Sequence, residues 1–160
     1  MKQKTFSLLL PIFLLLIISI SCTDTSNTSE VAKVKMPITG SWKLLSGTLV
    51  EKGDTTVTDY TKTSSFIKII NDTHFAFLQH DLQNGKDSST ASFSSGGGKY
   101  TLKDSTYTEH LEYCTAREWE GHDFSFILTL NNDTLVQRGV EKIESAGIDR
   151  LNIEKYIRIR

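Results

Sequence analysis

The 160-residue chain has no excess of basic residues, because 18 Lys and Arg stand against 19 Asp and Glu and the formal net charge is −1. Proteins that bind nucleic-acid phosphates need such an excess, so nucleic acid is not an expected partner. Proline is scarce, with none after residue 37, and the two cysteines are too few for a disulfide-rich scaffold. The length and composition fit one globular domain stabilised by its own core.

Sequence patterns of the common catalytic centres are also missing. The four histidines are scattered, and no nucleophile elbow, zinc-protease helix or P-loop spacing is present. We therefore predict no catalytic residue, no cofactor and no enzyme activity.

A metal site is not expected either. His110, Glu112 and Cys114 alternate along one predicted strand and offer a nitrogen, an oxygen and a sulfur on one face. Alternate residues of a strand lie roughly 6–7 Å apart, however, so the outer two cannot share one zinc ion without a bulge.

What the chain does contain is a long apolar run near its start. Two lysines precede it, it covers residues 6–20, and it ends in Ser21 and Cys22. The run is shorter than the roughly 20 residues of a membrane-spanning helix, and its order is that of a secretory signal. Residues 18–22 resemble the lipobox of bacterial lipoproteins, which implies removal of residues 1–21 and a lipid on Cys22. Plain secretion with cleavage near Ser21 is the alternative.

The lipobox resemblance implies a bacterial cell envelope as the location, with the lipid on Cys22 as the membrane anchor and the domain facing the periplasm or the surface. Residues 22–37 are mostly polar and lack periodicity, so we expect a flexible tether. Without residues 1–21 the balance of charged residues is 16 minus 19, or −3, which gives no second, electrostatic membrane contact.

Residues 38–160 are predicted to be all β. Thr, Ile, Phe, Tyr and Val dominate this part, apolar residues alternate, and short turns separate the runs. Only residues 143–151 could hold a short helix. Strands are expected at 39–50, 55–62, 65–70, 73–80, 97–102, 106–114, 123–130, 133–140 and 151–160. Because the connections look local, eight to nine such strands predict an antiparallel up-and-down barrel.

The two ends of this domain carry a further signal. Gly40-Ser41-Trp42 resembles the Gly-x-Trp signature that opens the lipocalin and wider calycin barrels. In that family the Trp closes the base of the barrel and a basic residue of the last strand packs over the indole, a role that the resemblance gives to Arg158. Residues 93–102 and 106–114 resemble bacterial lipocalin-like lipoproteins of unassigned function. The resemblance implies a barrel that can hold a small ligand.

Glu109 is the first candidate for contact with that ligand. It shares one strand face with Tyr107, Leu111 and Tyr113, and in an apolar barrel its pKa would rise unless a cation paired with it. An ion pair with Arg138 or Arg117 is the alternative. The same alternation selects further ligand-binding candidates, each of which could instead be core: Phe75, Phe77, Gln79, Tyr107, Tyr113, Phe124, Phe126 and Gln137.

Taken together, the sequence predicts a membrane-anchored, lipocalin-like protein that binds a small apolar or amphipathic molecule inside its barrel. The rival is an interaction module with a filled barrel that acts through the rim loops 82–92 and 115–122, where Trp119 is an exposed-aromatic candidate. The interior volume distinguishes the two. The sequence leaves the oligomeric state open.

Overall fold

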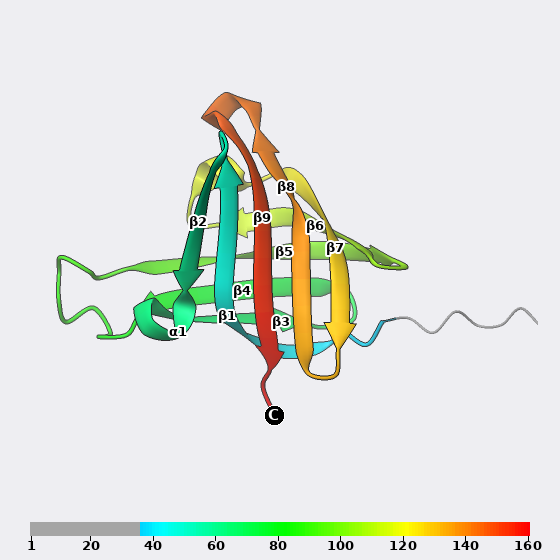
Figure 1. Ribbon diagram of the computed structural model, residues 1–160, viewed down its shortest axis with the longest axis horizontal. Helices are drawn as coiled ribbons and strands as arrows, with labels where there is room; N and C mark the ends of the chain where they lie inside the picture. Colours follow the sequence, from blue (N-terminus) through cyan, green and yellow to red (C-terminus); the bar gives the residue numbers. More distant parts are fainter. Residues whose placement is uncertain (1–35) are drawn as a thin grey trace, which may run out of the picture. The chain divides into compact units, whose positions relative to one another are not determined.

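The computed structural model describes residues 36–160, which form an antiparallel β-barrel (Figure 1). The predicted signal, Cys22 and all but the last two residues of the predicted tether lie outside the described residues. Within the described part, no helix has the length and apolar character needed to cross a membrane.

Strands make up most of this part of the chain. Their order along the chain, with three short helical turns, is β1 (Gly40–Glu51), β2 (Asp54–Asp59), α1 (Tyr60–Thr63), β3 (Ser64–Ile70), β4 (His74–Asp81), β5 (Phe93–Lys103), β6 (Thr106–Cys114), η1 (Arg117–Trp119), β7 (His122–Asn131), β8 (Thr134–Ile143), η2 (Glu144–Ala146) and β9 (Ile148–Arg158). From β3 onward each strand pairs with the next one, and β9 returns to pair with β1. The predicted all-β, up-and-down barrel is therefore confirmed, with eight strands in the closed ring and β2 as an addition.

The extra strand lies beside one half of β1. Residues 40–43 of β1 pair with β3, whereas residues 46–51 pair with β2. In Figure 1, β1, β9, β8 and β7 run upright at the front, and β3, β4 and β5 cross behind them. Helix α1 connects β2 to β3 at the end of the barrel where β1 no longer pairs with β3.

The base of the barrel has the predicted plug. Trp42 is fully buried, and the guanidinium carbon of Arg158 lies 4.1 Å from the centroid of its ring. Arg158 also donates hydrogen bonds to the carbonyls of Thr39 and Pro37, while the indole N–H of Trp42 donates to the carbonyl of Ile38 at 2.8 Å. Gly40 leaves room for this contact, since a Cβ there would lie 2.7 Å from an Arg158 nitrogen. The expected packing of Arg158 over Trp42 is confirmed.

Glycines 96–98 let three strands approach closely where the barrel bends. A Cβ on Gly98 would lie 2.0 Å from the carbonyl oxygen of His110, and one on Gly97 would lie 2.5 Å from that of Phe75. The β5–β6 ladder shifts register between Gly97 and Gly98, so β6 carries a β-bulge there. Strand bending, which glycine favours, is the physical role of this run.

The bulge overturns two sequence-based expectations. A bulge adds one residue and reverses the alternation beyond it. Tyr113, expected to face the interior, is 68% exposed, and the half-buried Cys114 lines the interior instead. His110 and Cys114 therefore do not share one strand face as the simple alternation predicted.

The short helix that residues 143–151 could have held does not extend beyond a single turn. Strand β8 runs to Ile143, a single turn covers Glu144–Ala146, and β9 starts at Ile148. Gly147, at φ 65°, ends that turn in the left-handed conformation that glycine adopts most readily. The β8–β9 pairing continues to the turn, from Thr134 opposite Ile157 to Ile143 opposite Ile148, and this long ladder outweighs the local helical tendency.

Candidate functional site

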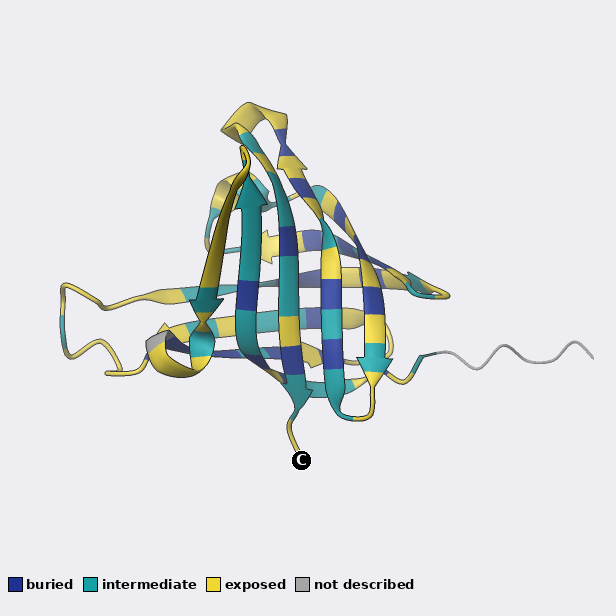
Figure 2. Ribbon diagram, in the orientation of Figure 1, coloured by how far each residue is buried: buried dark blue, intermediate teal, exposed yellow. Residues whose placement is uncertain are grey.

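The barrel is filled near Trp42 and hollow toward its other end. Figure 2 shows the buried residues as bands across the strands. The hollow half holds a cavity of about 250 Å³. Its apolar wall includes Leu49, Phe66, Phe77, Leu111, Trp119, Phe124, Phe126 and Tyr156, and its polar wall includes Lys68, Glu109, Gln137, Glu141, Arg150, Asn152 and Glu154. Typical small-molecule sites measure roughly 300–1,000 Å³, so this one suits a small ligand.

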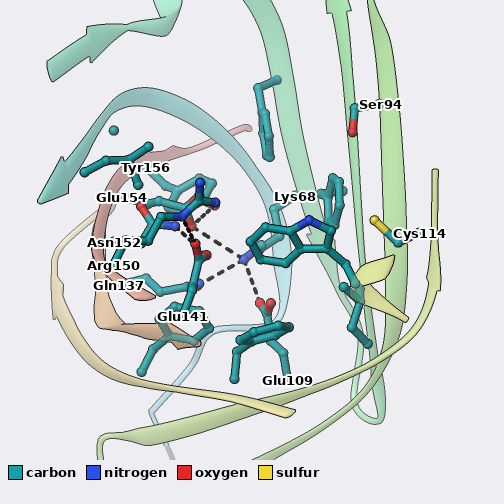
Figure 3. A pocket seen from close by; sticks show the side chains of 18 of the residues that line it. Lys68, Ser94, Glu109, Cys114, Gln137, Glu141, Arg150, Asn152, Glu154 and Tyr156 are labelled. Carbon is teal, nitrogen blue, oxygen red and sulfur yellow. Dashed lines mark hydrogen bonds and ion pairs between the residues drawn. The ribbon is translucent and has the colours of Figure 1, made fainter. Parts of the chain in front are cut away.

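Lys68 is the centre of the polar wall (Figure 3). Its Nζ lies 2.7 Å from Glu109 Oε1 and 3.0 Å from Gln137 Oε1, and 3.9 Å from Glu154 Oε2. The side chain is only 3% exposed. Three aromatic rings surround the ammonium group as well, with centroids 5.3–5.9 Å from Nζ, on Phe75, Tyr107 and Tyr156.

Glu109 faces the interior, as the alternation predicted. Burial raises the pKa of its carboxyl group, and the ammonium of Lys68 opposes that rise without cancelling it. Burial by itself would lower the pKa of Lys68, but the charges of Glu109 and Glu154 outweigh burial and hold that pKa above its usual value. The alternative of a structural ion pair at Glu109 is confirmed, but its cation is not an arginine. Arg138 is exposed and Arg117 pairs with Glu120, and Lys68 is the cation beside Glu109.

A second ion pair lines the cavity and is less deeply buried than the first. Arg150 Nε donates to Glu141 Oε2 at 2.7 Å, and Asn152 Nδ2 donates to the other carboxylate oxygen at 2.8 Å. The Arg150 guanidinium carbon lies 5.0 Å from the centroid of the Trp119 ring. Trp119 also packs on Phe124, with ring centroids 5.5 Å apart. Trp119 is thus half-buried over the cavity, and its predicted exposure on the rim is wrong.

Two tyrosine hydroxyls lie next to the carboxylates. Tyr156 donates to Glu154 Oε2 at 2.7 Å. Tyr107 is fully buried, and its hydroxyl makes no hydrogen bond of normal geometry with the described residues, although Glu109 is near enough to act on it electrostatically. Burial, and then the charge of Glu109, raises the pKa of Tyr107; burial and the charge of Glu154 do the same for Tyr156.

The predicted ligand-binding residues fall into three groups. Five of them lie on the cavity wall: Phe77, Glu109, Phe124, Phe126 and Gln137. Phe75 and Tyr107 are buried in the core beside Lys68, with their rings edge to face at 6.4 Å, and are not on that wall. Gln79 is not on the cavity wall and donates to Ser64 of the neighbouring strand β3, and Tyr113 faces outward beyond the bulge.

Sequence reasoning missed several residues of the polar wall. Lys68, in the middle of an apolar run, shares its strand face with Phe66 and Ile70, which was a usable signal of burial. Along β9, the buried Asn152 and Tyr156 flank Glu154 at the same spacing of two. Ile67 and Ile69 of β3, and Ile153 and Ile157 of β9, lie on the opposite face and made it look like the core face, which hid the polar interior.

Neither the known protein families nor the curated proteins offer a match to this chain in sequence. Among residues 36–160, no group of three or more His, Cys, Asp or Glu side chains is arranged to hold a metal ion. The site itself is a small cavity with an aromatic wall and a wall of paired charges and hydrogen-bonding groups.

Proposed function

We propose that this chain is a binding protein that holds a small amphipathic molecule in the hollow half of its barrel. The observation that supports this most directly is a cavity of about 250 Å³ whose wall includes the buried Lys68, Glu109 and Gln137. Burying ionised groups costs free energy, and apolar residues packed in the same space are often as stable or more so. A barrel whose interior served only as a core would be expected to be apolar, whereas a binding site uses buried polar groups to orient its ligand.

The size of the cavity limits the ligand. A volume of about 250 Å³ equals that of about eight waters of liquid at roughly 30 Å³ each. A molecule with one ring or a short chain and one polar group fits this space, and a long-chain lipid would have to protrude from it. The aromatic wall would receive the apolar part, and the polar wall would orient the head group.

The rim-loop alternative has less support. Its aromatic anchor, Trp119, is turned onto Phe124 and Arg150 and forms part of the cavity wall. In and after the other loop, Leu82 and Phe93 are 50% and 62% exposed, but single exposed apolar residues are common on protein surfaces.

The lipocalin resemblance adds to the proposal. A closed antiparallel barrel with Arg158 over Trp42 is the arrangement that the resemblance to lipocalins implied, and it supports a related mode of ligand binding. We also propose that a lipid on Cys22 anchors the barrel to a membrane of a bacterial cell envelope. A Cys22→Ala variant should appear in the soluble fraction and take up no radioactive fatty acid, whereas Cys114→Ala should stay in the membrane fraction. A Cys22→Ala protein that remains lipid-labelled would contradict the anchor.

Native mass spectrometry of the purified full-length protein tests the binding function. We expect a small molecule to stay bound to the wild type and to be lost from Ala116→Phe, because Ala116 lines the cavity and a phenyl group there takes up its volume. Ala91→Phe, on the exposed 82–92 loop, is the matched control and should keep the molecule. A wild-type protein that carries no bound molecule and does not bind small aromatic probes such as 2-phenylethanol contradicts the proposal.

A further inference from the structure

The charges on the cavity wall do not balance. Among the described residues, three carboxylates line the cavity, those of Glu109, Glu141 and Glu154, against the two cations Lys68 and Arg150. With all five ionised, the wall carries one excess negative charge. In a site of low dielectric constant, such an excess acts strongly on the charge of a bound molecule.

Both cations are already engaged by the protein. Lys68 donates hydrogen bonds to Glu109 and Gln137, and its Nζ also lies at ion-pair distance, 3.9 Å, from Glu154 Oε2. Arg150 is held by Glu141 at 2.7 Å and stacks on Trp119. An anionic ligand would find no free cation on the described wall and would approach three carboxylates.

The aromatic wall suits a cation as well. Lys68 Nζ lies 5.3 Å from the ring centroid of Tyr156, and the Arg150 guanidinium carbon lies 5.0 Å from that of Trp119, and both rings line the cavity. Both of the protein's own cations are therefore placed against ring faces in this cavity. The cavity also presents the rings of Phe66, Phe77, Phe124 and Phe126, which could contact the apolar part of a ligand or lie beneath its charge.

From this wall we propose that the cavity selects an organic cation, a molecule with a protonated amine on a small apolar or aromatic body. The inference rests on the proposed binding function and names the ligand class for the same cavity. Glu154 is the carboxylate that would receive the amine, because it lies farther from Lys68 than Glu109 does, at 3.9 Å against 2.7 Å. The bound cation would neutralise the excess charge that the empty wall carries.

Binding of a cation should also be linked to proton release. The titratable groups that line the cavity or act on its carboxylates are Lys68 from β3, Tyr107 and Cys114 from β6, Glu141 from β8, Arg150 and Tyr156 from β9, and Tyr60 from α1. Burial raises the pKa of Glu109, so part of the protein holds a proton there under mildly acidic conditions. An incoming ammonium group favours the ionised carboxylates and expels that proton, so its affinity should rise with pH.

Isothermal titration calorimetry with three probes of matched size tests the ligand class. The probes are 2-phenylethylamine, 2-phenylethanol and phenylacetate, titrated into the full-length protein in detergent, with heats of transfer into empty detergent subtracted. At pH 7.5 we expect the amine to bind about tenfold more tightly than the alcohol, and phenylacetate to bind most weakly. From about pH 5 to pH 8 the affinity for the amine should rise, while that for the alcohol should stay constant, because the amine remains protonated over this range.

Two variants that each remove one negative charge test whether the preference for the amine depends on the carboxylates of the cavity. Glu154→Gln should bring the ratio of amine to alcohol affinity close to one. Glu144→Gln removes one negative charge from η2, where the side chain is 84% exposed and away from the cavity, and should leave the ratio unchanged. If Glu154→Gln does not fold, the pH dependence of the wild-type protein still tests the proposal.

The possible failures are distinguishable. An alcohol or phenylacetate affinity equal to or above that of the amine overturns the cation inference and leaves the binding function standing. An equal loss of selectivity in Glu144→Gln overturns the role of the cavity carboxylates. If none of the three probes binds and native mass spectrometry shows no bound molecule, the binding function falls and the cation inference falls with it.

Discussion

The buried ammonium of Lys68 offers a sharp test of how the polar wall is stabilised. In Lys68→Met the apolar stem is roughly kept and the charge is removed. Glu109, whose side chain is 9% exposed, then loses a partner at 2.7 Å, and Glu154 loses one at 3.9 Å. Removing one member of a buried ion pair costs about 3–5 kcal/mol, because the remaining charge stays buried without compensation.

The loss should depend on pH in a defined direction. Without its cation, the pKa of Glu109 rises further than burial already raises it. A carboxyl group whose folded pKa lies above its unfolded value stabilises the fold when protonated, so stability falls as the pH rises above the unfolded value of about 4.3. Lys68→Met should therefore be closer to wild type at pH 5 than at pH 8.

Urea denaturation monitored by tryptophan fluorescence measures both effects. A domain of typical stability, about 5–15 kcal/mol, would remain folded enough to give a transition. Lys43→Met removes an exposed lysine on β1 and should change the free energy of unfolding by less than about 0.5 kcal/mol. In a double-mutant cycle with Glu109→Gln, the double variant should lose about 1–3 kcal/mol less than the sum of the two single losses.

A loss below about 1 kcal/mol for Lys68→Met would refute this reasoning. So would a loss that is the same at pH 5 and pH 8, because Glu109 would then not be the group left without compensation. Additive single losses would show that Lys68 and Glu109 act independently despite their short contact.

Three further predictions concern the base of the barrel, the bend at the glycines and the buried Tyr107. Arg158→Met should lower the free energy of unfolding, measured by urea denaturation, by about 2 kcal/mol, because it removes a cation over Trp42 and two hydrogen bonds to carbonyls. Arg117→Met, at an exposed arginine, should change it little. An equal loss in both variants would contradict the role of Arg158 at the base. Gly98→Ala should destabilise the fold by more than about 2 kcal/mol and so lower the melting temperature, because the new Cβ would meet the carbonyl oxygen of His110. Thr101→Ala, at an exposed position of the same strand, is the control and should melt as the wild type does. Burial raises the pKa of Tyr107, so its neutral form stabilises the fold, and stability should fall as the pH rises above the unfolded pKa of about 10. Tyr107→Phe should show a shallower fall in stability between about pH 10 and pH 11.5. An unchanged slope would exclude Tyr107 as the cause.

The strands and turns were predictable because their signals are local. Alternation at period two indicated β3, β4, β6, β7 and β8, and the turns near Lys52, Asp104 and Asn132 carry the positive φ angles that such short connections use. The base plug was predictable through a resemblance at the two ends of the chain. Trp42 and Arg158 then meet because the barrel closes, with β1 and β9 paired at these residues.

The site was predictable only in part. Glu109 and Gln137 were found because alternation gives the face of a side chain once the strand is known. Tyr113 was misplaced because a bulge in β6, opposite glycines that let the backbones approach closely, reverses the alternation without an unambiguous local signal. Trp119 was misplaced because its partners Phe124 and Arg150 become neighbours only after η1 folds against the barrel.

The sequence by itself determined that residues 38–160 form an antiparallel barrel, since strand periodicity and turn chemistry act over a few residues. Only the tertiary structure decided what the barrel contains. The partners of Lys68 lie 41 and 69 residues further along the chain, and no pattern over a few residues encodes a contact at that distance. Which carboxylate meets the ammonium group, and how much space remains beside them, depends on the register of every strand between them and on the bulge in β6.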